Sequence, residues 1–225
     1  MTDGKVLSVN VGVERPNPAK KLAMTGIDKL PVDHPVQVRA PGPKRTGLHS
    51  GLVGDPIGDT DHHGGDDQAV YAYAREDYDW WEAELGRSLP GGLFGENLTT
   101  AGVDVNGALI GEVWQIGDTL RLQPTFGRIP CSTFQAKMGE QRWIKRFTEV
   151  NRTGAYLRVL RPGEVRAGDP IEIVHRPERS VSIAEAFRIY MHEPESLARL
   201  LDAEGLPAGM ADEIRDRLTR VKPVR

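Results

Sequence analysis

The sequence predicts a mainly β protein with α structure, in which an antiparallel β-barrel-like domain at residues 1–176 precedes a small three-helix C-terminal domain at residues 177–225. Two observations lead to this prediction. Short apolar stretches separated by glycine–aspartate turns, in a chain with 25 Gly and 16 Pro, are typical of barrels and sandwiches. After about Arg176 the apolar residues change to a four-residue spacing, which indicates amphipathic helices.

The predicted strands are short and apolar, and turn residues flank most of them. They are Lys5–Val13, Val36–Val38, Val113–Gln115, Leu120–Leu122, Ala155–Leu160 and Ile171–Val174. The turns Gly117-Asp118 and Gly168-Asp169-Pro170 each lead from one strand into another, so neighbouring strands are expected to pair antiparallel.

Helices are predicted in two parts of the chain. One covers Ala74–Leu85, where apolar residues recur at a four-residue spacing opposite many acids. The other three follow residue 177. Ser182 and Glu185 form a capping box for the first, Pro194 begins the second, and Met210, Ile214 and Leu218 mark the apolar face of the third.

Charge and cysteine content restrict the class of protein. The formal net charge of −3 gives no basic field for nucleic acid or an anionic membrane. No apolar run is long enough to cross a bilayer, and the segment Met1–Lys5 lacks the order of a signal peptide. The single cysteine excludes an intrachain disulfide, which agrees with a reducing cytoplasm. We therefore expect a cytoplasmic protein.

Cys131 is the first candidate for chemistry. Ser132 and Gln135 have capping-box spacing, which places Cys131 one residue before a helix N-cap. The helix dipole and the nearby Arg128 would both favour a thiolate, the form needed by a nucleophile or a soft-metal ligand. The alternative is a buried, inert cysteine.

Two further segments have the composition of ligand-binding turns. Residues 59–67 combine two histidines and four carboxylates with Gly64-Gly65, and are either a metal site, a turn lining a ligand or a solvated acidic loop. Residues 94–100 offer glycine, amide and hydroxyl groups, and are either a cradle for an anion or pterin edge or an ordinary polar turn. The segment 42–47 has the outline of a phosphate loop but lacks its Gly-Lys-Ser/Thr ending.

Taken in order, several motifs resemble the MOSC family and its YiiM-type branch. The resemblance extends over most of residues 5–175, and the helical tail looks like the extra domain of that branch. The motifs are Gly54-Asp55, Asp59 through His63-Gly64-Gly65, Ala69-Val70-Tyr71, Phe94-Gly95-Glu96-Asn97-Leu98-Thr99, Ile110-Gly111-Glu112-Val113-Trp114, Arg128-Ile129-Pro130-Cys131, Lys145-Arg146-Phe147 and Gly154-Ala155-Tyr156-Leu157-Arg158-Val159.

The resemblance implies a barrel-like MOSC domain that holds a molybdopterin, with Cys131 as catalytic residue and ligand to molybdenum. The implied cofactor-binding residues are His63, Gly64, Asn97, Arg128 and Arg158, the last as a candidate for the cofactor phosphate. The implied reaction is the reduction of N-hydroxylated compounds, as in detoxification of hydroxylaminopurine-type bases. A separate flavin or iron–sulfur reductase would supply the electrons, since the chain has no motif for either centre.

The sequence departs from the family pattern at two positions. Gln68 stands where a lysine is expected after the His-Gly-Gly turn, which removes one candidate for binding the cofactor phosphate. Gly127 stands where a proline commonly precedes the arginine.

Two other functions fit the same residues. Cys131 would carry a persulfide in a sulfur carrier or transferase, a role to which the broader family is linked, together with pyridoxal-phosphate partner domains. Alternatively, a non-catalytic protein would bind the cofactor without reducing any substrate.

Overall fold

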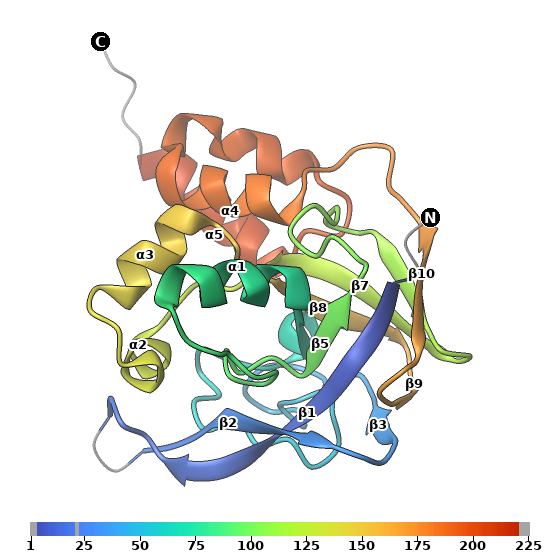
Figure 1. Cartoon of the computed structure of the whole chain (residues 1–225). Coiled ribbons are helices and arrows are strands. Elements are labelled where there is room, and N and C mark those ends of the chain that lie inside the picture. Colours follow the sequence, from blue (N-terminus) through green and yellow to red (C-terminus); the bar gives the residue numbers. More distant parts are fainter. Residues whose placement is uncertain (1–3, 21–22, 221–225) are drawn as a thin grey trace.

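Seven strands close into a barrel in the computed structural model, which describes residues 4–20 and 23–220 (Figure 1). The order is β10-β6-β7-β8-β4-β5-β1, and the pairing of β1 with β10 closes it, while β2 extends the sheet beside β1. The strands are β1 (Gly4–Pro16), β2 (Met24–Val32), β3 (Val36–Val38), β4 (Val70–Ala74), β5 (Leu98–Ala101), β6 (Val113–Ile116), β7 (Leu120–Gly127), β8 (Ala155–Arg161), β9 (Gly163–Val165) and β10 (Pro170–His175).

The predicted fold class is confirmed, and each of the six predicted strands corresponds to a strand of the structure. Strands β2, β4, β5 and β9 were not predicted. The pair β4–β5 runs parallel, in contrast to the antiparallel pairing of the other strands. This parallel pair is important for the site because residue 97, immediately before β5, lies beside Tyr71 of β4.

Three helices cover one side of the barrel and enclose a cluster of buried aromatic rings. They are α1 (Arg75–Leu85), α2 (Ser132–Met138) and α3 (Trp143–Val150). A short 3-10 turn, η1 (Asp66–Gln68), precedes β4. The predicted helix at 74–85 is confirmed as α1. The aromatic cluster comprises Tyr71, Tyr73, Tyr78, Trp81, Leu89, Phe94, Phe134, Met138, Trp143 and Phe147.

The start of α2 differs from the prediction by one residue. Cys131 is itself the N-cap, with extended backbone, and Ser132 is the first helical residue. A capping box at Ser132 and Gln135 is therefore wrong, because the backbone already turns into the helix one position earlier. The thiol consequently lies nearer to the free N–H groups of the first helical turn than the sequence suggested.

The C-terminal region contains the three expected helical segments, which pack together at one end of the molecule (Figure 1). These are α4 (Ile183–His192), η2 (Pro194–Asp202) and α5 (Ala208–Arg220). The Ser182 hydroxyl caps α4 by accepting from the N–H of Glu185 at 3.2 Å. The second segment is a 3-10 helix rather than an α-helix.

The tail shares one apolar core with the barrel. Ile183 and Phe187 of α4 are fully buried and belong to the same cluster as the barrel interior. At Gly127 on β7, an added Cβ would lie 3.3 Å from the Phe187 ring and 3.4 Å from Ile183. Glycine at this position therefore allows α4 to pack closely on β7.

We predict that the chain cut after Arg176 still folds cooperatively, because the strands of the barrel all lie upstream. Its stability should fall, since losing one buried Phe contact of this kind costs about 3–5 kcal/mol, equivalent to about 10 °C in melting temperature for a chain of this size. Calorimetry of residues 1–176 beside the full chain tests this. A broad, non-cooperative transition would show that residues 177–225 are not a separable domain. Of the two predicted domains, residues 1–3 of the first and residues 221–225 of the second lie outside the described structure.

Candidate cofactor site at Cys131

A cavity of about 1,110 Å³ opens beside Cys131. Its walls come from regions that are far apart in sequence: the β1–β2 hairpin, the loops between residues 43 and 68, β4 and the segment before β5, the segment 125–133, β8, and the C-terminal helices. Small-molecule sites typically have volumes of about 300–1,000 Å³, so the cavity is large enough for a cofactor and a small substrate together. No helix in the described part of the chain is both long and apolar enough to cross a membrane.

Cys131 is half-buried on the wall of this cavity. Burial alone raises the pKa of its thiol, but the His63 side chain, the Arg128 guanidinium and the backbone N–H of Phe134 outweigh that effect and lower the pKa from 9.0 to about 6. The sulfur makes no capping hydrogen bond of normal geometry, yet the N–H dipoles at the start of α2 still favour its anionic form. Cys131 is therefore a thiolate at neutral pH.

Arg128 is the buried cation next to this thiolate, and it is only 5% exposed. Its guanidinium lies 4.3 Å from the centre of the Phe134 ring and 5.1 Å from that of Tyr71, and one amino group donates to the carbonyl of Phe94. Its Nε is buried and has no hydrogen-bond partner. Since a buried N–H without a partner is costly, this atom is available to a ligand or a water molecule.

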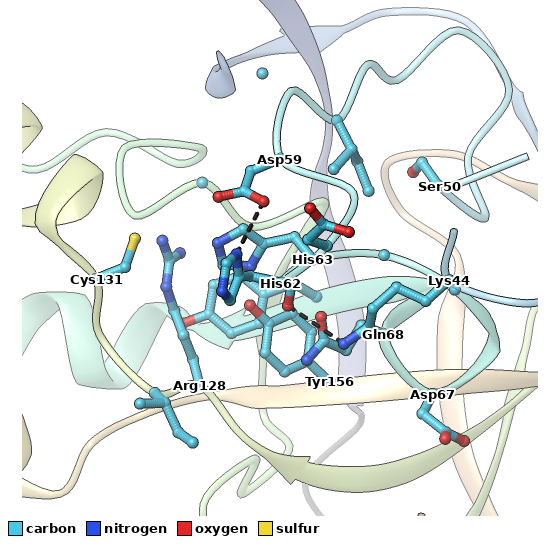
Figure 2. A pocket seen from close by; sticks show the side chains of 18 of the residues that line it. Lys44, Ser50, Asp59, His62, His63, Asp67, Gln68, Arg128, Cys131 and Tyr156 are labelled. Atoms are coloured by element: carbon cyan, nitrogen blue, oxygen red, sulfur yellow. Dashed lines mark hydrogen bonds and ion pairs between the residues drawn. The ribbon is translucent and has the colours of Figure 1, made fainter. Parts of the chain in front are cut away.

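His63 and Gly64 also line the cavity. Gly64 has φ +81°, and a Cβ there would lie 2.6 Å from the carbonyl oxygen of His49. Only glycine fits this turn, because a side chain would collide with the backbone of His49, against which the turn packs. Figure 2 shows His62 joined to Asp59, at 3.0 Å. In the described residues, no three His, Cys, Asp or Glu side chains converge to hold a metal ion, so the structure does not support a separate metal site at 59–67.

Asn97 lines the cavity, but internal hydrogen bonds occupy its amide. Its oxygen accepts from the N–H of Tyr71 at 3.1 Å, and its nitrogen donates to Asp55 at 3.0 Å. Asp55 also accepts from the Ser50 hydroxyl at 2.7 Å and pairs with Lys29. These contacts fix the loop after Gly54 against the barrel, so Asn97 positions the cavity wall; a contact with cofactor stays a prediction.

Arg158 differs from the other predicted residues because it is not among those that line the cavity. Its Nε donates to Asp67 at 2.8 Å and another of its nitrogens donates to Gln123 at 3.0 Å. Its guanidinium donors are thus engaged by Asp67, which itself lines the cavity, and by Gln123. The structure thus brings Cys131, His63, Gly64, Asn97 and Arg128 to one cavity, but not Arg158.

Sequence reasoning missed two groups of cavity residues. Lys44 belongs to a segment that was considered only as a phosphate loop and rejected. Tyr190, Met210 and Glu213 come from the C-terminal helices, whose pattern indicated packing alone. A lysine in a glycine-rich segment was an available signal for Lys44, whereas no local pattern marks the helix residues.

The titration of Cys131 can be measured directly, because it is the only cysteine. We predict that its rate of alkylation by iodoacetamide rises about tenfold between about pH 5 and 7 and then levels off, since a thiol with pKa about 6 is about nine-tenths ionised at pH 7. The pKa of the Cys131 thiol is lower in the folded than in the unfolded protein, so ionisation of the thiol stabilises the fold. This contribution to the free energy of unfolding is complete above about pH 9 and is lost as the pH falls through about 6. Denatured protein is the control, and a native profile that rises only above about pH 8 would contradict the prediction.

Comparison with known proteins agrees with this geometry. The MOSC domain family matches residues 59–172, a range that contains His63, Asn97, Arg128 and Cys131. The chain is 32% identical to the YflK protein of Bacillus subtilis (strain 168) over 225 residues, or 97% of this chain and 96% of that one. It is 30% identical over 161 residues to a protein of Gibberella moniliformis named reductase, matching 70% of this chain but only 28% of that protein's length.

The crystal structure of YiiM from Geobacillus stearothermophilus has a TM-score of 0.77 with this structure, at 29% identity, over 96% of this chain and 99% of that chain. The match therefore includes the helical tail as well as the barrel. The chain belongs to the MOSC family and is a protein of the YiiM type.

Proposed function

We propose that this protein is a molybdenum-cofactor-dependent reductase of N-hydroxylated compounds, such as hydroxylaminopurine-type bases. The observation that carries the proposal is the low thiol pKa of Cys131, next to a buried arginine in the large cavity of a MOSC-domain protein. The similarity to a protein named reductase supports the same type of reaction.

The residues that line the cavity fit a molybdopterin. Cys131 offers a soft anionic donor, which suits molybdenum. The described residues hold no cluster of three or more protein ligands, so the pterin would supply other donors beside the thiolate. The buried Nε of Arg128 and the buried Oε1 of Gln68 both lack partners, as expected of groups that a bound molecule completes.

The chain's own residues have three roles in this proposal. Cys131 binds the metal, and Arg128 and His63 keep its sulfur ionised. The His63-Gly64-Gly65 turn lines the cavity and would border the bound cofactor. The apolar side chains of Ile129 and Met210 on the wall would exclude water from a flat heterocyclic substrate.

The reaction breaks the N–O bond of the substrate, takes up two electrons and two protons, and releases an amine and water. The bound cofactor would supply the two-electron redox chemistry. One cysteine is too few to hold an iron–sulfur cluster, and the sequence has no dinucleotide-binding motif. We therefore propose a separate flavin or iron–sulfur reductase as the electron donor.

Metal analysis combined with an activity assay tests the proposal. Protein made in a host that synthesises molybdopterin should contain near-stoichiometric molybdenum and should reduce a hydroxylaminopurine when a competent reductase is added. A sulfur carrier, which the low thiol pKa of Cys131 would also suit, should instead carry a persulfide and no molybdenum. A non-catalytic cofactor-binding protein should contain molybdenum but reduce nothing.

A further inference from the structure

Three tyrosines of the described chain, Tyr71, Tyr156 and Tyr190, line the cavity, and their hydroxyls differ in whether they have a partner. The hydroxyl of Tyr71 donates to the carbonyl of Thr153 at 2.7 Å, and that of Tyr190 donates to the carboxylate of Glu213. No hydrogen bond among the described residues involves the hydroxyl of Tyr156, which is accessible from the cavity. Tyr156 therefore offers the cavity a phenol O–H that the protein itself does not use.

Strand pairing fixes the position of this phenol. Tyr156 lies in β8, where it pairs with Tyr71 of β4 on one side and with Phe126 of β7 on the other. Its backbone carbonyl accepts from the Thr125 hydroxyl at 3.0 Å. The centre of its ring lies 5.1 Å from that of the Tyr71 ring. A bound ligand would thus meet the hydroxyl at a defined place on the wall, with little loss of side-chain freedom.

The charges around Tyr156 favour a phenol that keeps its proton until a reaction removes it. Figure 2 shows Tyr156 between Arg128 and Gln68. Burial raises the pKa of Tyr156 above its ordinary value, the Arg128 guanidinium acts in the opposite direction, and the Cys131 thiolate raises the pKa again. The phenol is therefore protonated at neutral pH, while the guanidinium would stabilise the phenolate formed when the proton leaves.

The two histidines of the cavity wall are less suited to give up a proton to a substrate. His63 forms a hydrogen bond with the side chain of Cys131 and favours its thiolate. The ring of His62 is held by Asp59 at 3.0 Å. Both rings already have a partner, whereas the hydroxyl of Tyr156 can act on a substrate without disturbing the thiolate.

We propose that the hydroxyl of Tyr156 is a catalytic acid, which donates first a hydrogen bond and then its proton to the oxygen of the substrate's N–OH group. The substrate takes up two electrons from the redox chemistry of the bound cofactor, and its N–O bond breaks. The phenol O–H bond breaks as well, and its proton leaves with the oxygen as water. Solvent then gives one proton to the nitrogen and one to the phenolate, so each turnover consumes two electrons and two protons. That a reduction takes place rests on the proposed function; that Tyr156 meets the oxygen rests on its free hydroxyl.

The first test varies the leaving group. An N-hydroxyamidine must lose its oxygen as water, whereas its O-acetyl ester loses acetate, which needs no proton to leave. In protein from a cofactor-producing host, Tyr156→Phe should lower kcat about a hundredfold with the N-hydroxyamidine but less than about threefold with the ester. Molybdenum content and melting temperature should stay at their wild-type values, because the hydroxyl that is removed has no protein partner.

The matched control is Tyr73→Phe. The hydroxyl of Tyr73 donates to the carbonyl of Arg152 at 2.9 Å, and this residue does not line the cavity. Its loss should therefore leave the ratio of the two rates at the wild-type value, even where the melting temperature falls. Rates that fall by the same factor with both substrates in Tyr156→Phe, or a wild-type rate with the N-hydroxyamidine, would overturn the catalytic role.

The second test measures binding without catalysis. Calorimetric titration of the cofactor-free full chain with a hydroxylaminopurine and with the matching aminopurine isolates the contribution of the oxygen. Tyr156→Phe should weaken binding of the hydroxylated base about fivefold, the effect of one hydrogen bond, and leave the aminopurine unchanged. An unchanged preference for the hydroxylated base would overturn the contact, as would a wild type without any preference. Wild-type protein that contains no molybdenum and reduces neither substrate would instead contradict the proposed function, and this titration would still decide on Tyr156.

Discussion

Replacing Cys131 with serine should abolish the reduction of N-hydroxylated substrates while leaving the fold nearly unchanged. Serine is close to cysteine in size, and the side chain is only half-buried, so the free energy of unfolding should change by no more than about 1–3 kcal/mol. The hydroxyl is a hard and weakly acidic donor that cannot replace a thiolate on molybdenum. Loss of a residue that merely supports a metal ligand costs about 10–100-fold, so loss of the ligand itself should cost at least about a hundredfold.

The informative experiment measures activity, molybdenum content, pterin content and melting temperature on the same preparation. Pterin should survive in part, because the other residues that line the cavity do not depend on the sulfur. Ser132→Ala, an exposed change at the next position, is the matched control and should keep wild-type values. Full activity in the serine variant would end the metal-ligand hypothesis. Lost activity together with a collapsed melting transition would favour an inert core cysteine.

Replacing Arg128 with methionine should raise the pKa of Cys131 from about 6 toward its ordinary value, because the guanidinium stabilises the thiolate and a neutral side chain does not. One neighbouring opposite charge typically changes a pKa by about 1–3, so the alkylation profile should move to higher pH by a similar amount. Activity should fall by at least about tenfold, in line with the loss of other groups that support a metal ligand.

The stability of this variant should change little, which separates it from an ordinary core defect. Methionine fills similar space between the Tyr71 and Phe134 rings, and removing a buried charge that has no carboxylate partner recovers its desolvation cost. Arg146→Met is the matched control, since Arg146 lies 5.5 Å from the Trp81 ring of the same aromatic cluster but does not line the cavity. An unchanged alkylation profile in Arg128→Met would show that the thiolate does not depend on this charge.

Of the four strands that local sequence patterns missed, β4 and β5 show a physical reason. All five residues of β4 are buried, so the strand shows no alternation that a periodicity argument can detect. Strand β5 is four residues long, and its parallel pairing with β4 depends on a contact across the intervening helix α1. Such elements are defined by tertiary pairing, which a single sequence does not display.

The distinction between local and tertiary determinants also applies to the residues of the candidate cofactor site. Arg128 and Cys131 are three positions apart and precede a helix, so their combined effect on the thiol pKa follows from local sequence. Lys44 and Glu213 reach the cavity only through packing of a loop on a glycine turn and of α5 beside α4. Arg158 shows the opposite case: its motif is present, but its guanidinium is bound to Asp67 and Gln123, and Arg158 does not line the cavity.

The shared wall between barrel and tail makes ligand binding and tail docking thermodynamically linked. Tyr190 and Met210 belong to the tail, Cys131 belongs to the barrel, and all three border one cavity. A ligand that contacts both parts binds only the docked arrangement, and at a hundred times its dissociation constant it stabilises that arrangement by about 2.7 kcal/mol. Helix α5 has one buried residue, Ile214, so its own packing holds it weakly. A cofactor bound in this cavity would thus add to the cohesion of the fold, and the loaded protein would be the more rigid form where the tail meets the barrel.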